Sequence, residues 1–214
     1  MMRTQTMRHL LTSAVVALLA TGTAGLTAAT EDSDASGWER LELNLENSEA
    51  TDDPLPVVCE TRPEACDLGQ RAAASLPYPW DELGYVVVIA EPIDSWHAGR
   101  TLSSEQRIEL FVDEDSQVRS LTSTLAHEIG HAIHQRCNDP LLTIWSERRE
   151  LPPGTPDHVE APHDYDSAGE DFAEAFAQYL GYGPSRSTVG PTVTQVWLED
   201  NADLFEADVC ETLE

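Results

Sequence analysis

The segment His127-Glu-Ile-Gly-His131 combines metal-binding and proton-transferring side chains within five residues. On a helix, two histidines four positions apart lie on one face and can bind the same metal ion. Glu128 follows the first histidine, where a carboxylate can take a proton from a water molecule that the metal activates. His127 and His131 are therefore candidate zinc ligands, and Glu128 is the candidate catalytic base. The alternative is two solvated histidines on an ordinary amphipathic helix.

A catalytic zinc site needs a third protein ligand. The extended pattern with a third histidine would need glycine at 134 and histidine at 137, where the chain has His134 and Cys137. Glu170 and Glu174 remain, because they lie four residues apart on one face of a later predicted helix. Glu170 is the predicted ligand, and Glu174 is predicted to accept a hydrogen bond from a ligand histidine. Glu170 could instead cap its helix together with Ser167, and Glu174 could lie on a solvated face.

At this point the chain resembles a known family. The segments His127-Glu-Ile-Gly-His131 and Glu170-Asp-Phe-Ala-Glu174-Ala-Phe176 are similar to the gluzincin peptidases, and more narrowly to the catalytic domain of anthrax lethal factor and the Pro-Pro endopeptidases. The resemblance spans residues 69–206, and these two segments are its specific part. It implies a zincin-like fold, a zinc cofactor, the first glutamate of the second segment as third ligand, and the second glutamate in support of the site.

The resemblance also bears on the transition state and the substrate. The family has an oxyanion-stabilising tyrosine about seven residues before the third ligand; here that position is His163, and the nearest tyrosine is Tyr165. The implied activity is a zinc-dependent endopeptidase acting on a protein or peptide. By analogy, residues 107–112 would be the edge strand that holds an extended substrate. A non-catalytic, zinc-stabilised secreted binding protein is the alternative, and a metal-free acidic interaction protein is a second one.

The candidate site residues lie on two predicted helices, over residues 117–135 and 169–180. In the first helix, apolar side chains recur three and four positions apart and form a packing face opposite the histidines. His134, one turn beyond His131, is predicted to lie on the helix surface. The connection over residues 138–166 has no strong periodicity and is expected to be irregular.

Other expected elements surround these two helices. Strands are expected over residues 85–90 and 107–112, and further helices over 67–75 and 193–207. Strands come before most helices, which predicts an α+β domain. We therefore expect a small mixed sheet with an active-site helix, followed by a mainly helical C-terminal part.

The N-terminal region is predicted to be a targeting signal that is not part of the folded domain. Arg3 and Arg8 precede a short apolar run and a stretch of small residues, which is the layout of a secretory signal peptide over residues 1–29. A retained anchor is the alternative. Residues 30–56 are acidic and are expected to be a flexible leader, with a propeptide as a further possibility. We expect residues 57–214 to form one domain of an extracellular monomer without stable membrane insertion.

Charge and cysteine content narrow the partners further. The chain has 39 acidic and 12 basic residues, a net charge of −27, so phosphates would be repelled and nucleic acid is not an expected partner. Adaptation to high salt and a neutral compositional bias both account for this acidity. Four cysteines in an exported chain predict two disulfides. Of the three possible pairings, Cys59–Cys66 with Cys137–Cys210 is preferred.

Overall fold

The computed structural model describes residues 56–95, 97–137, 139–158, 166–187 and 189–213. The predicted signal peptide, all of the predicted leader but its last residue, and both oxyanion candidates, His163 and Tyr165, lie outside these residues. The described part is an α+β structure with four strands and six α-helices. None of its helices has both the length and the apolar composition that crossing a bilayer requires.

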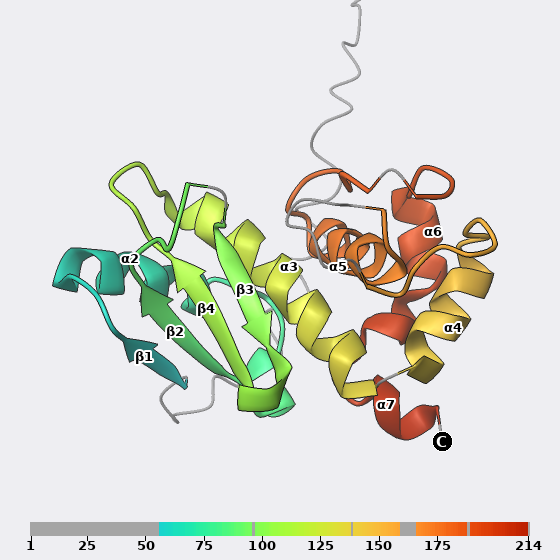
Figure 1. The fold of residues 1–214 in the computed structure, drawn as a ribbon, viewed down its shortest axis with the longest axis horizontal. Helices are drawn as coiled ribbons and strands as arrows, with labels where there is room; N and C mark the ends of the chain where they lie inside the picture. The colour runs from blue at the N-terminus through green and yellow to red at the C-terminus, as the bar shows by residue number, and fades with distance from the viewer. Residues whose placement is uncertain (1–55, 96, 138, 159–165, 188, 214) are drawn as a thin grey trace, which may run out of the picture. The chain divides into compact units, whose positions relative to one another are not determined.

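The four strands form one mixed sheet in the order β1–β2–β4–β3 (Figure 1). β2 (Val86–Ala90) and β4 (Arg107–Phe111) are parallel neighbours at its centre and confirm the two predicted strands. β1 (Val57–Cys59) runs parallel to β2 at one edge. β3 (Gly99–Leu102) runs antiparallel to β4 at the other edge. The expectation that residues 107–112 form the edge strand is therefore wrong, because β3 covers that side of β4.

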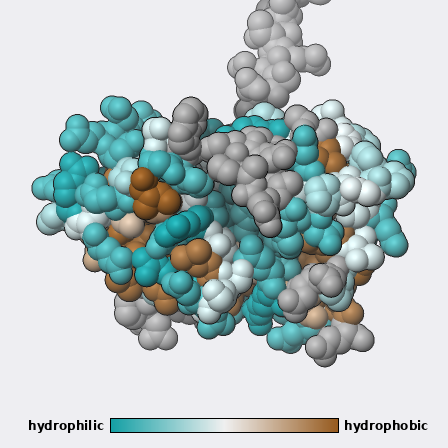
Figure 2. Space-filling model, in the orientation of Figure 1, coloured by the Kyte–Doolittle hydropathy of each residue, from teal (hydrophilic) through white to brown (hydrophobic). Residues whose placement is uncertain are grey.

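Two helices pack on one face of this sheet, α2 (Pro63–Ala74) and α3 (Val118–Cys137) (Figure 1). Alternate side chains of the central strands are fully buried in the core that these helices share: Val87, Ile89, Ile108 and Leu110. The opposite face carries no helix among the described residues, and Figure 2 shows hydrophobic patches over it. Side chains of the opposite face are also buried, although no described helix covers them: Val88, Glu109 and Phe111.

The helices that carry the candidate site match their predictions closely. α3 begins one residue later and ends two residues later than the predicted helix over residues 117–135, and its apolar stripe Leu121, Leu125, Ile129 and Ile133 is buried. α5 (Ala168–Tyr179) corresponds to the predicted helix over residues 169–180. Periodic apolar positions were a sufficient signal for both helices.

The region between these helices is less irregular than expected. α4 (Asp139–Arg148) occupies the first part of residues 138–166, so the prediction of an irregular connection is wrong there. Its Trp145 is fully buried and packs edge-on against Phe172 of α5, with ring centroids 5.0 Å apart. The tertiary contact supplies the stability that the local pattern does not reveal.

The C-terminal region is helical but interrupted. The predicted helix over residues 193–207 is divided into α6 (Gln195–Asp200) and a short 3-10 turn, Ala202–Phe205, and α7 (Val209–Thr212) follows. Cys210 of α7 is joined to Cys137 at the end of α3, which confirms that predicted disulfide.

The second predicted disulfide is not formed. Cys59 and Cys66 are free thiols in the structure. Cys66 is buried in α2 and its Sγ donates to the carbonyl oxygen of Thr61 at 3.7 Å, whereas Cys59 on the edge strand accepts from Gln70 Nε2 at 3.8 Å. The two thiols still interact, because burial and a hydrogen bond with Cys66 raise the pKa of Cys59 to about 11. The preferred pairing is therefore correct for one bond only.

Candidate metal centre

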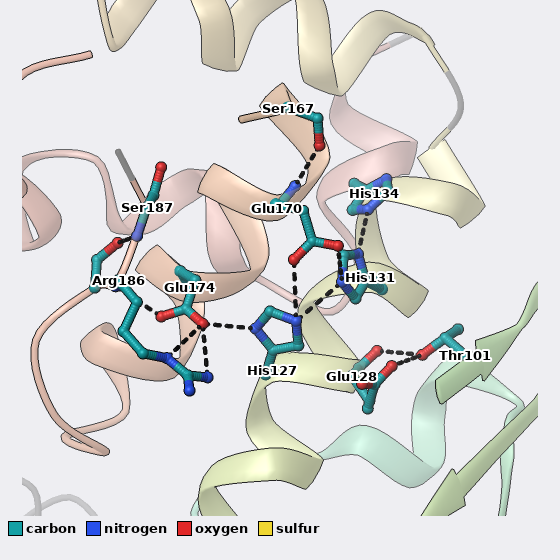
Figure 3. A network of polar contacts seen from close by, with 11 residues as sticks. Thr101, His127, Glu128, His131, His134, Ser167, Glu170, Glu174, Arg186 and Ser187 are labelled. Carbon is teal, nitrogen blue, oxygen red and sulfur yellow. Dashed lines mark hydrogen bonds and ion pairs between the residues drawn. The ribbon is translucent and has the colours of Figure 1, made fainter. Parts of the chain in front are cut away.

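The centre forms where α3 and α5 cross. At the crossing, Gly130 faces Ala173, and a Cβ on Gly130 would lie only 2.7 Å from the Cα of Ala173. The glycine inside the His-Glu-Ile-Gly-His segment therefore lets the two helix backbones approach more closely than any other residue would allow. This close crossing brings the acidic side chains of α5 to the histidines of α3 (Figure 3).

Donor atoms of three residues from the two helices lie close together. His127 Nε2 and His131 Nε2 lie 3.1 Å apart. Glu170 places Oε2 at 3.4 Å from His127 Nε2 and Oε1 at 3.3 Å from His131 Nε2. Among the described residues, these three are the group of histidine, cysteine and acidic side chains whose geometry can hold a metal ion.

The spacing of the three donors fits zinc. Two ligands of a tetrahedral zinc ion, each about 2.0–2.1 Å from the metal, lie about 3.3 Å from each other. The separations of 3.1, 3.3 and 3.4 Å are close to that value, although each histidine faces a different oxygen of the Glu170 carboxylate. The histidine side chains are 14% exposed and that of Glu170 is 25% exposed, so the centre is accessible to solvent and to a further ligand.

Glu170 is presented by the first turn of α5. Ser167 is the N-cap of this helix, and its Oγ accepts a hydrogen bond from the backbone N–H of Glu170 at 3.1 Å. The hydrogen bond that Ser167 makes in a capping box is therefore present. The Glu170 carboxylate points to the two histidines instead (Figure 3). Capping and the predicted metal binding would thus use different atoms of the same residue.

Glu174 lies one turn further along α5 and contacts the other side of the His127 ring. Its Oε1 is 3.4 Å from His127 Nδ1, and its side chain is 5% exposed. Burial excludes the alternative that Glu174 lies on a solvated helix face. Arg186 donates to the same carboxylate from its backbone N–H at 2.8 Å and from Nη2 at 2.9 Å. Glu174 is therefore held in place from two sides.

The candidate base Glu128 is held by the edge strand. It is 7% exposed, and its carboxylate Oε2 lies 2.9 Å from Thr101 Oγ1 of β3. The same hydroxyl is 2.8 Å from the backbone oxygen of Glu128, so Thr101 fixes both the helix and the side chain. Glu128 follows His127 directly but does not belong to the triangle of donors. Its negative charge acts on His127, whose pKa it helps to raise, so Glu128 is near enough to the histidines to stay the candidate proton acceptor.

His134 is buried, and the prediction that it lies on the helix surface is wrong. It is 1% exposed, because α5 packs over this face of α3. Its Nε2 lies 2.9 Å from Nδ1 of His131. Burial, together with the neighbouring His131, lowers the pKa of His134 well below its ordinary value and so favours the uncharged ring.

The carboxylates around the histidines shift the pKa values of the centre when no metal is bound. Burial disfavours the charged form of His127, but Glu170, Glu174 and Glu128 outweigh burial and raise the pKa of His127 to about 10. Burial acts to raise the pKa of Glu170 and of Glu174 as well. The histidines nonetheless hold the pKa of Glu170 well below its usual range, and His127 with Arg186 lowers the pKa of Glu174 to about 2.

Zinc binding near neutral pH is expected to release about one proton from this centre. Coordination needs an unprotonated Nε2, and His127 keeps its proton up to a pH near its raised pKa of about 10. The apparent zinc affinity should therefore rise by about tenfold per pH unit from neutral pH up to that value. Titration calorimetry in buffers of different ionisation enthalpy measures the number of protons. Glu174→Gln should lower it, and binding without proton release by the unaltered chain would contradict this assignment.

Five predicted site residues lie together at this centre: His127, Glu128, His131, Glu170 and Glu174. Three further residues that contact them were not predicted as part of the site: Thr101, His134 and Arg186. The signal for His134 was present, because it continues the stripe of His127 and His131 at the next helical position. Thr101 and Arg186 lie in segments without a local pattern, and no sequence signal pointed to them.

Comparisons of the chain with protein-family models, with curated proteins and with solved structures found no match. Its function is therefore inferred from the residues of the centre and their geometry.

Proposed function

We propose that the protein is a secreted zinc metalloendopeptidase with a zincin-like fold. The observation that carries the proposal is the close grouping of His127, His131 and Glu170, at separations suited to tetrahedral zinc, with the buried Glu128 near enough for its charge to act on His127. Three protein ligands leave a coordination position for water or substrate, which is the arrangement of catalytic zinc sites; structural sites have four.

Each side chain of the centre has a distinct part in peptide hydrolysis. The chemistry that zinc supplies here is Lewis acidity, towards a water molecule and towards the scissile carbonyl. Glu128 takes the proton of the attacking water and delivers it to the leaving amine. Glu174 keeps the His127 ring in position through Nδ1. His163 and Tyr165 stay the candidates for stabilising the oxyanion, on the family resemblance alone.

The edge strand β3 suits an extended peptide substrate. Among the described strands it pairs with β4 only, so its other side can pair with a further strand. Thr101 of β3 contacts Glu128, which places this strand beside the catalytic base. A peptide added to β3 would run past the centre with its backbone held by main-chain hydrogen bonds. β3 thus replaces residues 107–112 as the proposed substrate-binding strand.

Two observations favour an exported enzyme over a zinc-stabilised binding protein. A metal that only stabilises the fold needs its ligands and no further carboxylate. Glu128 is not a proposed ligand, yet it is buried and held by Thr101. The Cys137–Cys210 disulfide is typical of chains that leave the reducing cytosol, which agrees with the proposed signal peptide at residues 1–29.

Cleavage of a mixed peptide library tests the proposal. The zinc-loaded chain, with its disulfide intact, should cut peptides at internal bonds, because the base and the open metal site are both in place. A chelator should abolish cleavage and added zinc should restore it, as measured by mass spectrometry of the products. If the folded, zinc-loaded chain cuts nothing and zinc removal unfolds it, the binding protein is the correct alternative.

A further inference from the structure

The three histidines of α3 form one continuous row. His127, His131 and His134 are spaced four and three residues apart, so they lie on the same face of the helix. The row is linked by short contacts, 3.1 Å between the Nε2 atoms of His127 and His131 and 2.9 Å between His131 Nδ1 and His134 Nε2 (Figure 3). The proposed zinc ligands end at His131, so the third histidine needs a separate explanation.

The ring nitrogens of His131 have different neighbours, and this decides where its proton lies. Nε2 faces His127 and Glu170, the other donors of the proposed zinc site. A histidine that binds a metal through Nε2 carries its proton on Nδ1. In this chain the atom that can accept that proton's hydrogen bond is His134 Nε2 at 2.9 Å.

We propose that His134 is a positioning residue, which accepts a hydrogen bond from His131 Nδ1–H and thereby fixes the tautomer and the orientation of this zinc ligand. Ligand histidines usually donate their second N–H to a carboxylate, a carbonyl or water. Here His127 has a carboxylate partner in Glu174, whereas His131 has the imidazole of His134. The inference rests on the proposed function, because it assigns a role relative to the metal.

The packing around His134 holds its ring in this position. Phe172 of α5 contacts the ring edge-on, with centroids 6.0 Å apart, and His158 stacks on it at 5.3 Å. Gly169 faces the ring as well, and a Cβ there would come within 3.2 Å of His134 Nε2 and 2.9 Å of the backbone oxygen of Asp157. The glycine leaves room for the imidazole between α3 and α5. A ring confined in this way can orient its partner.

Zinc affinity, measured on the purified full chain by competition with a chromophoric chelator, tests the proposal without relying on activity. His134→Leu removes the acceptor and should weaken zinc binding by about ten- to a hundredfold. His134→Gln should retain an affinity close to that of the unaltered chain, because its amide oxygen can reach the position of Nε2. Thr122→Val is the matched control. It alters another buried polar residue of α3, which bonds to Val118 and not to the centre, and it should leave zinc affinity unchanged.

The outcomes separate this inference from the proposed function. If the unaltered chain binds no zinc, the proposed function itself fails. If it binds zinc and His134→Leu does so equally well, or if the Leu and Gln variants are weakened alike, His134 has only a packing role and the inference is overturned. Far-UV circular dichroism establishes that each variant is folded. Should His134→Leu not fold, His134→Asn serves instead, because its shorter amide does not reach His131 and should lose the affinity that Gln keeps.

Discussion

Glu128→Gln is expected to lower the kcat of peptide hydrolysis by about a hundred- to ten-thousandfold while leaving zinc content unchanged. An amide cannot take the proton of the attacking water, but it has nearly the size and shape of the carboxylate. It also keeps an oxygen that can accept from Thr101 Oγ1, which lies 2.9 Å from the carboxylate in the unaltered chain. The proposed zinc ligands are His127, His131 and Glu170. Glu128 is not among them, so the metal should stay bound. Turnover of a cleaved library peptide and metal analysis of the same sample measure both effects.

A surface substitution of the same kind provides the control. Glu199→Gln removes one acidic charge from the exposed side of α6 and should change neither quantity. If Glu128→Gln retains full turnover, the base has been assigned wrongly. If it loses its zinc together with its activity, Glu128 acts on the metal site and not on the proton, which also contradicts the assignment.

Arg149→Met is expected to lower the free energy of unfolding by about 3–5 kcal/mol, because it leaves a buried carboxylate without its cation. Arg149 and Asp171 are 3% and 0% exposed and form a double hydrogen bond at 2.9 and 3.0 Å. Trp145 Nε1 donates to the same carboxylate at 2.9 Å, and Arg149 also reaches the backbone oxygen of Pro191 at 2.8 Å. Asp171 follows the proposed ligand Glu170, so this network anchors the start of α5. Urea unfolding of the zinc-loaded chain measures the loss.

The neighbouring residue offers a matched comparison. Arg148 makes the same double contact with Asp203, at 2.9 and 3.0 Å, but the two side chains are 39% and 57% exposed. Arg148→Met should therefore cost only about 0–1 kcal/mol. In the double variant with Asp171→Asn, which keeps an acceptor for Trp145, much of the Arg149→Met loss should be recovered. Equal losses for Arg148→Met and Arg149→Met would show that burial of the pair does not stabilise this fold.

The two helices of the centre were predictable from their apolar repeat, and the shortest strands were not. α3 and α5 were found within two residues, because their apolar side chains recur at helical spacing over three turns or more. β1 and β3 have three and four residues and offer no such repeat. Their positions are determined by pairing with β2 and β4, which is a property of the assembled sheet.

α4 illustrates a different reason for failure. Residues 138–166 are rich in proline and acidic residues, so a long irregular connection was the expected structure. The side chains that α4 buries are few: Leu141, Leu142 and Trp145. The helix forms where these side chains pack against α5 and the C-terminal turn, with Trp145 and Phe205 rings 5.8 Å apart. Tertiary burial outweighed the local composition.

By itself, the sequence determined which side chains of α3 are candidates for the centre, because the spacing of His127 and His131 on a periodic helix places both histidines on one face. It also indicated Glu170 and Glu174, since both lie on one face of a second helix. Only the tertiary structure decided that the two faces meet, through the close approach of Gly130 and Ala173. It also decided that Thr101 contacts Glu128 and that His134 lies buried against His131. These contacts join segments that are distant in sequence, or depend on which face a neighbouring helix covers, and a local periodicity carries neither kind of information.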